Sequence, residues 1–171
     1  MTNTERWEAK FTMSQPAANW IQPQFDDSGW TKGKAAFGTK DMKRIGTEWN
    51  TEDIWVRRSF NLNQDLTNDI IYLRYSHDDV FELYLNGEKL VATDYSWNDD
   101  VTIELSASAK AKLRKGQTLL QHTVTTQPAE HTLISACSVR TNSSATSRKL
   151  LSRSLSMYYR HRPTIHSPAV R

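Results

Sequence analysis

The 171 residues are enough for one domain with a hydrophobic core, and their composition is that of an ordinary soluble globular protein. The apolar runs fall well short of the ~20 residues that a membrane-spanning helix needs, and the polar start MTNTERWEAK lacks the apolar core of a signal peptide, so we expect a cytoplasmic chain with no membrane partner. The formal net charge of +3 divides into 15 − 18 = −3 for residues 1–120 and 7 − 1 = +6 for residues 121–171, so the basic character belongs to the tail and predicts no nucleic-acid partner for the main part.

Most of the chain before residue 121 alternates apolar and polar residues as β-strands do. In DIWVRRSF (53–60) and DIIYLRYS (69–76) the alternation is nearly regular. VFELYL (80–85) continues it and runs directly into Asn86-Gly87, a dipeptide typical of two-residue hairpin turns because both residues tolerate positive φ. A return strand is therefore expected over 89–92.

Two more segments complete the pattern. Val101, Ile103 and Leu105 indicate another strand, and SASAKAKLRKGQ (106–117) is the only helix-like piece, with one or two turns that Gly116 would end before a strand opens at TLL (118–120). Short strands between turn residues, with almost no helix, are typical of an antiparallel β-sandwich. The sequence therefore predicts an all-β fold.

The stretch HDDVFELYLNGEKL (77–90) places His77, Asp78 and Asp79 directly before a strand. Neighbouring side chains entering a strand point to opposite faces, so Asp78 and Asp79 are not the facing carboxylates of a glycosidase, which lie about 5 to 9.5 Å apart. They either bind backbone N–H groups at the turn, or contact a ligand hydroxyl or a structural cation at the rim. We take all three residues as candidates for ligand contact and not for catalysis.

Tryptophans in polar surroundings form the second group of candidates. TEWNTED contains Trp49, Asn50 and Asp53, and DYSWNDD contains Trp97. Sugar-binding sites stack the apolar face of a sugar on an aromatic ring, while nearby polar groups orient the hydroxyls. The alternative is that these rings seal the ends of the sandwich, because Trp is usually mostly buried. Trp49 and Trp97 are the better candidates for ligand contact because they sit among loop residues.

Motifs for catalysis are missing from the sequence. It contains no G-x-S-x-G, P-loop, C-x-x-C or H-E-x-x-H, and its single cysteine, Cys137, cannot form an internal disulfide. We therefore assign no catalytic residue, no metal ligand and no cofactor, and expect that the chain is not an enzyme.

Four segments carry a resemblance to a known family: NWIQPQFDDSGWTKGKAAFGT (19–39), GTEWNTEDIWVRRSFNL (46–62), HDDVFELYLNGEKL (77–90) and LRKGQTLL (113–120). Their order and spacing resemble the galactose-binding-like jelly-roll module of glycoside hydrolase family 2 enzymes and of Bacteroides glutaminase A-like multidomain proteins, over about residues 7–120. The resemblance implies a non-catalytic β-sandwich beside a catalytic domain, with carbohydrate and that catalytic domain as partners. It also implies a parent protein that is periplasmic or extracellular.

The resemblance stops near Leu120, where family members usually continue with a stretch like AHCHNTTGGAYVDFGL. Here QHTVTTQPAEHTLISACSV follows instead. A shifted reading frame joins the third base of each codon to the first two bases of the next. Read in this frame, with a suitable choice of synonymous codons, the segment can encode Ala, His, Cys and His, and then most of the remaining residues of the family sequence. Our hypothesis is a frameshift near codon 121. A natural basic tail is the alternative.

We accordingly expect a galactose-binding-like module over 1–120, with 121–139 able to replace the last strand in part, and a disordered or weakly helical basic tail over 140–171. The leading functional hypothesis is a carbohydrate-binding or structural accessory module. A protein-interaction sandwich that docks a partner or a catalytic domain is the alternative. Nucleic-acid binding by RKLLSRSLSMYYRHR (148–162) is the least favoured of the binding functions.

Overall fold

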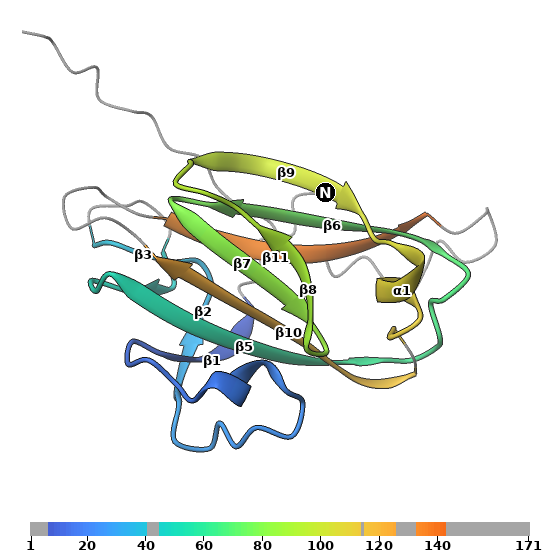
Figure 1. The fold of residues 1–171 in the computed structure, drawn as a ribbon, viewed down its shortest axis with the longest axis horizontal. Coiled ribbons are helices and arrows are strands. Elements are labelled where there is room, and N and C mark those ends of the chain that lie inside the picture. The colour runs from blue at the N-terminus through green and yellow to red at the C-terminus, as the bar shows by residue number, and fades with distance from the viewer. Residues whose placement is uncertain (1–6, 41–44, 114, 126–132, 143–171) are drawn as a thin grey trace, which may run out of the picture.

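The computed structural model describes residues 7–40, 45–113, 115–125 and 133–142, which form two stacked β-sheets (Figure 1). The described strands are β1 (Glu8–Thr12), β2 (Thr31–Lys34), β3 (Phe37–Gly38), β4 (Thr47–Glu48), β5 (Asp53–Leu62), β6 (Ile70–His77), β7 (Val80–Leu85), β8 (Glu88–Ala92), β9 (Asn98–Glu104), β10 (Gly116–Thr125) and β11 (Leu133–Asn142). One sheet has the order β2-β1-β5-β10-β7-β8 and the other has the order β4-β3-β11-β6-β9. Apart from the short parallel pair of β3 and β4, the pairings are antiparallel. The predicted all-β antiparallel sandwich is confirmed.

The hydrophobic core lies between the sheets and follows from the period-two alternation of the strands. In β5, Ile54 and Val56 are fully buried, and in β6 Ile71 and Leu73 are buried in the same way. Aromatic rings close the core, among them Phe37, whose ring packs at 5.3 Å from that of Phe11 in an edge-to-face arrangement. The fully buried large side chains are Trp49, Phe37, Phe81, Ile54, Leu66, Ile71, Leu73, Leu83, Leu85, Leu113 and Leu120.

The predicted hairpin between β7 and β8 is confirmed. Asn86 and Gly87 take φ values of 49° and 84°, and the register pairs Leu85 with Glu88 on either side of the turn. Positive φ at both central residues produces the twist that matches two antiparallel strands. The Asn86 side chain adds a second anchor, since its Oδ1 accepts from the backbone N–H of Leu119 at 2.8 Å.

The helix-like segment forms one turn. α1 (Ala107–Lys110) begins after Ser106, whose hydroxyl accepts from the backbone N–H of Ala109 at 3.2 Å as an N-cap. The expectation that Gly116 ends this helix is wrong, because Gly116 is the first residue of β10. Among the described residues, no helix has the length and apolar character needed to cross a membrane.

The chain after Leu120 forms parts of both sheets. β10 continues to Thr125 between β5 and β7, and β11 pairs with β6 and β3. The strand β11 ends at Asn142, so residues 140–142 belong to it. Residues 143–171, on which the rest of the expected tail falls, lie outside the described residues, as do residues 126–132.

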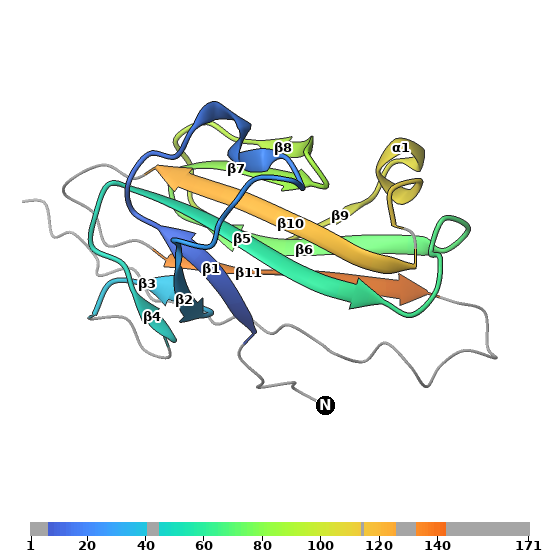
Figure 2. The same ribbon diagram turned by 90° about the horizontal axis from the view of Figure 1, so that it is seen from below.

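A long connection between β1 and β2, residues 13–30, lies against the outer face of the six-stranded sheet, where Figure 2 shows it in blue. It contains a 3-10 turn (Ala18–Ile21). Its Trp20 ring packs edge-to-face on Tyr84 at 5.7 Å and stacks on Trp30 at 6.5 Å. We call residues 13–30 the strap. It gives the sheet a small second core on the side away from the main one.

Candidate functional site

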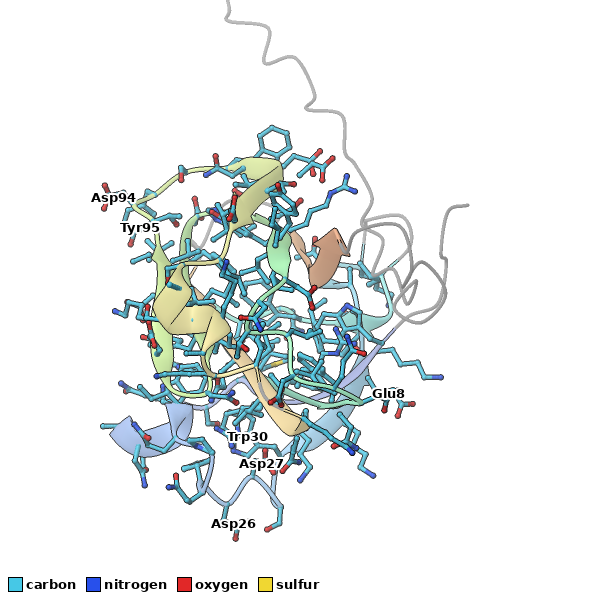
Figure 3. The ribbon with its side chains drawn as sticks, turned by 90° about the vertical axis from the view of Figure 1, so that its right-hand side faces the viewer. Glu8, Asp26, Asp27, Trp30, Asp94 and Tyr95 are labelled. Atoms are coloured by element: carbon cyan, nitrogen blue, oxygen red, sulfur yellow. The ribbon has the colours of Figure 1, made fainter. Side chains whose placement is uncertain are left out.

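The loop between β8 and β9, residues 93–97, presents aromatic rings to solvent. Tyr95 is 60% exposed and Trp97 is 54% exposed. Ile70, at the beginning of β6, is the other large hydrophobic residue exposed among the described residues. Figure 3 shows Asp94 and Tyr95 at the outer margin of the molecule. Two large rings two residues apart on one loop therefore form the main exposed aromatic feature of the described chain.

Hydrogen bonds hold both ends of this loop. At its beginning, the Thr93 N–H donates to the carbonyl of Phe81 at 3.0 Å, and the Phe81 N–H donates to Thr93 Oγ1 at 3.0 Å. Within it, Ser96 Oγ donates to the Asp94 carbonyl at 3.1 Å and accepts from Asn98 Nδ2 at 2.9 Å. The segment that carries the rings is thus fastened to β7 on one side and to β9 on the other.

His77 supports the loop from inside the sandwich. Its imidazole is 1% exposed and lies nearly parallel to the Phe81 ring, at 4.8 Å between centroids and 8° between planes. His77 Nδ1 lies 2.9 Å from the carbonyl oxygen of Asp79, so Nδ1 carries the proton that this bond requires. His77 Nε2 lies 3.3 Å from Asn98 Nδ2 and accepts from it.

Burial lowers the pKa of His77, and the hydrogen bond to the Asp79 carbonyl and the Asp79 charge only partly oppose this effect. The neutral imidazole is therefore the form that fits this position. His77 does not reach the surface, and the expectation of direct ligand contact is wrong for it because its ring is part of an aromatic stack. It acts on the loop through Asn98.

The acids near His77 hold the turn and the start of β9. Asp78 and Asp79 are half-buried, and Asp79 takes a φ of 64° at the turn between β6 and β7. Asp99 Oδ1 accepts from Ser76 Oγ at 2.8 Å, and the Asp100 carboxylate accepts from both Nε and Nη2 of Arg74. Within the described ranges, no group of three His, Cys, Asp or Glu side chains could hold a metal ion.

Trp49 corrects one of the sequence predictions. Its side chain is 1% exposed, and its indole N–H donates to Thr51 Oγ1 at 3.0 Å and to the Asp53 carbonyl at 3.2 Å. The loop folds back over the ring because these acceptors satisfy its only polar group. Trp49 is therefore a core residue with no face open to a ligand. Asn50 is exposed, and half-buried Asp53 accepts from Thr125 Oγ1 at 2.6 Å.

The strand registers bring the predicted residues to one end of the sandwich, at the left in Figure 1. Thr125, at the end of β10, pairs with Asp53 on one side and with Val80 on the other. His77 pairs with Asn98 across β6 and β9. The loops with Asn50 and Asp53, with Asp78 and Asp79, and with Trp97 therefore share this end. The sequence analysis treated these segments separately, and the strand pairing brings them together, although the side chains of Trp49 and His77 turn inward.

Sequence reasoning missed Tyr95, which is more exposed than Trp97. The available signal was its position in TDYSWND, among residues that favour loops, directly between two alternating strands. It also missed the buried polar cluster under the strap. Arg57, 3% exposed, donates to the carbonyls of Trp20 and Gln22 and, through Nε, to Asp27 Oδ2 at 2.9 Å. This cluster fastens the strap to β5.

No family model matches the sequence, and no curated protein matches it. Solved structures do. A β-glycosidase from Bacteroides vulgatus is 15% identical with a TM-score of 0.55, over 81% of this chain and 20% of that chain. The β-glucuronidase from Ruminococcus gnavus in complex with D-glucaro 1,5-lactone is 16% identical with a TM-score of 0.52, over 71% and 21%. A β-glucuronidase from glycoside hydrolase family 2 is 17% identical with a TM-score of 0.52, over 73% and 14%.

At these identities the likeness shows the fold. The resemblance to the sandwich module of glycoside hydrolase family 2 enzymes is thereby confirmed as a likeness of fold. The chain spans only 14 to 21% of the length of these three enzymes. A fold of this kind hosts many functions, so what the chain does has to be argued from its own residues.

Proposed function

We propose that the chain is a non-catalytic accessory β-sandwich of glycoside hydrolase type, which contacts carbohydrate through Tyr95 and Trp97. The observation that supports this most is the exposure of these two rings, at 60% and 54%, on one loop. Aromatic rings in water are favourable partners for the apolar faces of sugars, and neighbouring polar side chains then orient the hydroxyls. Asn50 and Asp94 are exposed at this end and are suited to that role.

The hydrogen bonds of the loop support the same proposal. A ligand that binds a flexible loop must pay the entropy of ordering it, whereas a loop held in advance avoids most of that cost. Ser96 and Asn98 bond to each other, Asn98 bonds to His77, and Thr93 bonds to Phe81. The platform is therefore formed before a ligand arrives.

The accessory role is supported by the span of the chain relative to structures that share its fold. It matches 14 to 21% of three enzymes whose names are β-glycosidase or β-glucuronidase. We infer that the sandwich belongs beside a separate catalytic domain and carries no reaction centre of its own.

The first prediction concerns Trp97→Ala and Tyr95→Ala. Each should weaken retention of the bound glycan by roughly tenfold, because a central aromatic contact commonly carries more than about 1 kcal/mol of binding energy. Affinity electrophoresis against a panel of neutral and anionic polysaccharides measures this effect.

Ile70→Ala provides the matched control. Ile70 is 44% exposed and begins β6, whereas His77, which supports the loop, ends that strand. This variant should bind as the wild type does. The proposal would be contradicted if the Tyr95→Ala/Trp97→Ala double variant retained every glycan as strongly as the wild type does.

The second candidate is docking of a catalytic domain by the same rings. The lengths of the matched enzymes favour it. This chain spans only 14 to 21% of them, so the part of each enzyme that shares this fold is joined to a much longer polypeptide. Under this alternative Tyr95 and Trp97 would be interface residues, and no glycan would depend on them. The electrophoresis experiment therefore separates the two functions.

A further inference from the structure

Two connections at the end of the sandwich that carries Tyr95 and Trp97, between β6 and β7 and between β8 and β9, are acidic. The stretches 75–88 and 91–104 contain no Lys or Arg. They do contain Asp78 and Asp79 in the turn between β6 and β7, Asp94 in the aromatic loop, and Asp99 and Asp100 at the beginning of β9. Asp94 and Asp99 are the acids nearest in sequence to the two rings, and these stretches supply no cation beside them.

Arg74 is the basic residue nearest in sequence to the turn between β6 and β7, and its charge is already neutralised by an ion pair. It lies in β6, and its guanidinium binds the Asp100 carboxylate through Nε and Nη2. A fork of this kind satisfies the charge and the geometry of both partners. Asp99 differs, because its hydrogen-bond donor, Ser76 Oγ, is neutral, and the described residues form no ion pair with its carboxylate.

The acids lie close enough to Trp97 to act on a bound charge. Asp99 is two residues from Trp97 and Asp94 is three, so their Cα atoms lie within about 7 Å and about 11 Å of it even if the chain is fully extended. The Debye length at physiological ionic strength is about 8 Å. Figure 3 shows Asp94 beside Tyr95, whereas Asp26 and Glu8 lie on other sides of the molecule.

We infer that this site selects uncharged glycans and rejects uronates and sulfated sugars. The inference rests on the proposed function and specifies the chemical class of its ligand. Carboxylates accept hydrogen bonds from the hydroxyls of a neutral sugar. They repel the carboxylate of a uronate, which finds no cation among the residues of these two connections to neutralise it. The two rings thus bind the apolar faces of sugars irrespective of charge, and the acids weaken the binding of anionic sugars.

The test compares each neutral polysaccharide of the panel with an anionic counterpart of similar backbone, such as methyl-esterified and free-acid oligogalacturonides. At low salt the wild type should retain the neutral members at least about tenfold more strongly. The difference should shrink in about 1 M salt, where the Debye length falls to about 3 Å. The double variant Asp94→Asn/Asp99→Asn should gain retention of the anionic members, because each Asn keeps one acceptor oxygen, replaces the other with an NH2 donor and loses the charge.

The variant Glu8→Gln/Asp26→Asn is the matched control. It removes two negative charges at positions remote from Asp94 and should leave the preference unchanged. If the wild type retains anionic members as strongly as neutral ones, and Trp97→Ala abolishes both, the inference is overturned while the proposed function stands. If no glycan depends on Trp97, the proposed function fails and the inference fails with it.

Discussion

At the scale of single residues, His77 shows how a buried polar group determines a surface loop. Its ring stacks with Phe81 and Tyr75, and its two nitrogens have different partners. Nδ1 donates to the Asp79 carbonyl, which leaves Nε2 as an acceptor for Asn98. A protonated imidazole would direct a donor at the Asn98 amide nitrogen and would place a positive charge inside the sandwich. Neutral His77 is therefore a condition for the observed loop.

The pH dependence of stability follows from the lowered pKa of His77. The unfolded chain binds this proton near pH 6.5, whereas the folded chain binds it only at lower pH. Between these two pKa values the unfolded state holds more protons, so the free energy of unfolding should fall as the pH drops through this window. Above pH 6.5 His77 should have no effect on this dependence.

Urea unfolding of the wild type and His77→Gln at several pH values measures this contribution. The variant should lose the part of the slope that lies just below pH 6.5, because glutamine does not titrate. Identical slopes in the two proteins would contradict the role assigned to His77.

At the scale of elements, the strap depends on one ion cluster, formed by buried Arg57 with partly exposed Asp27 and Lys10. Arg57 contacts backbone carbonyls of the strap and forms an ion pair with Asp27, which also binds Lys10 Nζ at 2.7 Å. Burial by itself would raise the pKa of Asp27, but the hydrogen bonds and charges of Lys10 and Arg57 outweigh it and lower the pKa. The carboxylate is therefore charged at neutral pH and fastens the strap to both β1 and β5.

Arg57→Lys should release the strap. A lysine has a point charge and cannot reach two carbonyls and a carboxylate with one planar fork. We expect a loss of about 2 kcal/mol in the free energy of unfolding, less than for a fully buried pair because Asp27 is 21% exposed. Fluorescence of Trp20 and Trp30, which lie in the strap, should shift before the global transition.

Arg74→Lys is the matched control for Arg57→Lys. It changes the same side chain in an ion pair whose partners are 29% and 48% exposed, where a loss of at most about 1 kcal/mol is expected. Equal losses in the two variants would show that burial of Arg57 is unimportant for the strap.

At the scale of the whole molecule, the segment after Leu120 is part of the fold despite its different composition. β11 lies between β3 and β6, and β10 lies between β5 and β7, so neither is an edge strand. Gln121, at the point where the composition changes, is fully buried, and its Oε1 has no hydrogen-bond partner among the described residues. Such a group costs stability. The frameshift hypothesis itself stays a prediction.

Truncation tests the contribution of β11. A chain that stops after Thr125 would leave the β6 hydrogen-bonding groups that face β11 unpaired, would separate β3 and β4 from the rest of their sheet, and would open part of the core. The loss should exceed the marginal stability of a domain, about 5 to 15 kcal/mol, so this chain should aggregate or remain unfolded.

A chain that stops after Asn142 keeps every described element and should unfold cooperatively, with the same circular dichroism spectrum in the strand region as the full chain. A folded, monomeric product of the shorter truncation would show that β11 is dispensable.

Local pattern was sufficient where neighbouring residues decide the structure. The alternation around Ile54 and Ile71 predicted β5 and β6, and Asn86-Gly87 predicted the hairpin, because side-chain period and φ preference are properties of short segments. The short strands β1 to β4 were not predicted. Two to five residues carry too little periodicity, and their pairing partners lie elsewhere in the chain.

The sequence by itself determined the two-layer all-β architecture, whereas the strand registers decided that the candidate residues gather at one end of the sandwich. Only the tertiary structure decided which rings face solvent. Trp49 and Trp97 occupy similar polar loops in the sequence, yet one is buried and the other is 54% exposed. The reason is that burial depends on whether the folded chain supplies a partner for each polar atom. Thr51 and Asp53 supply one for the Trp49 indole, whereas Tyr95 and Trp97 lie in the loop between β8 and β9 with their rings exposed.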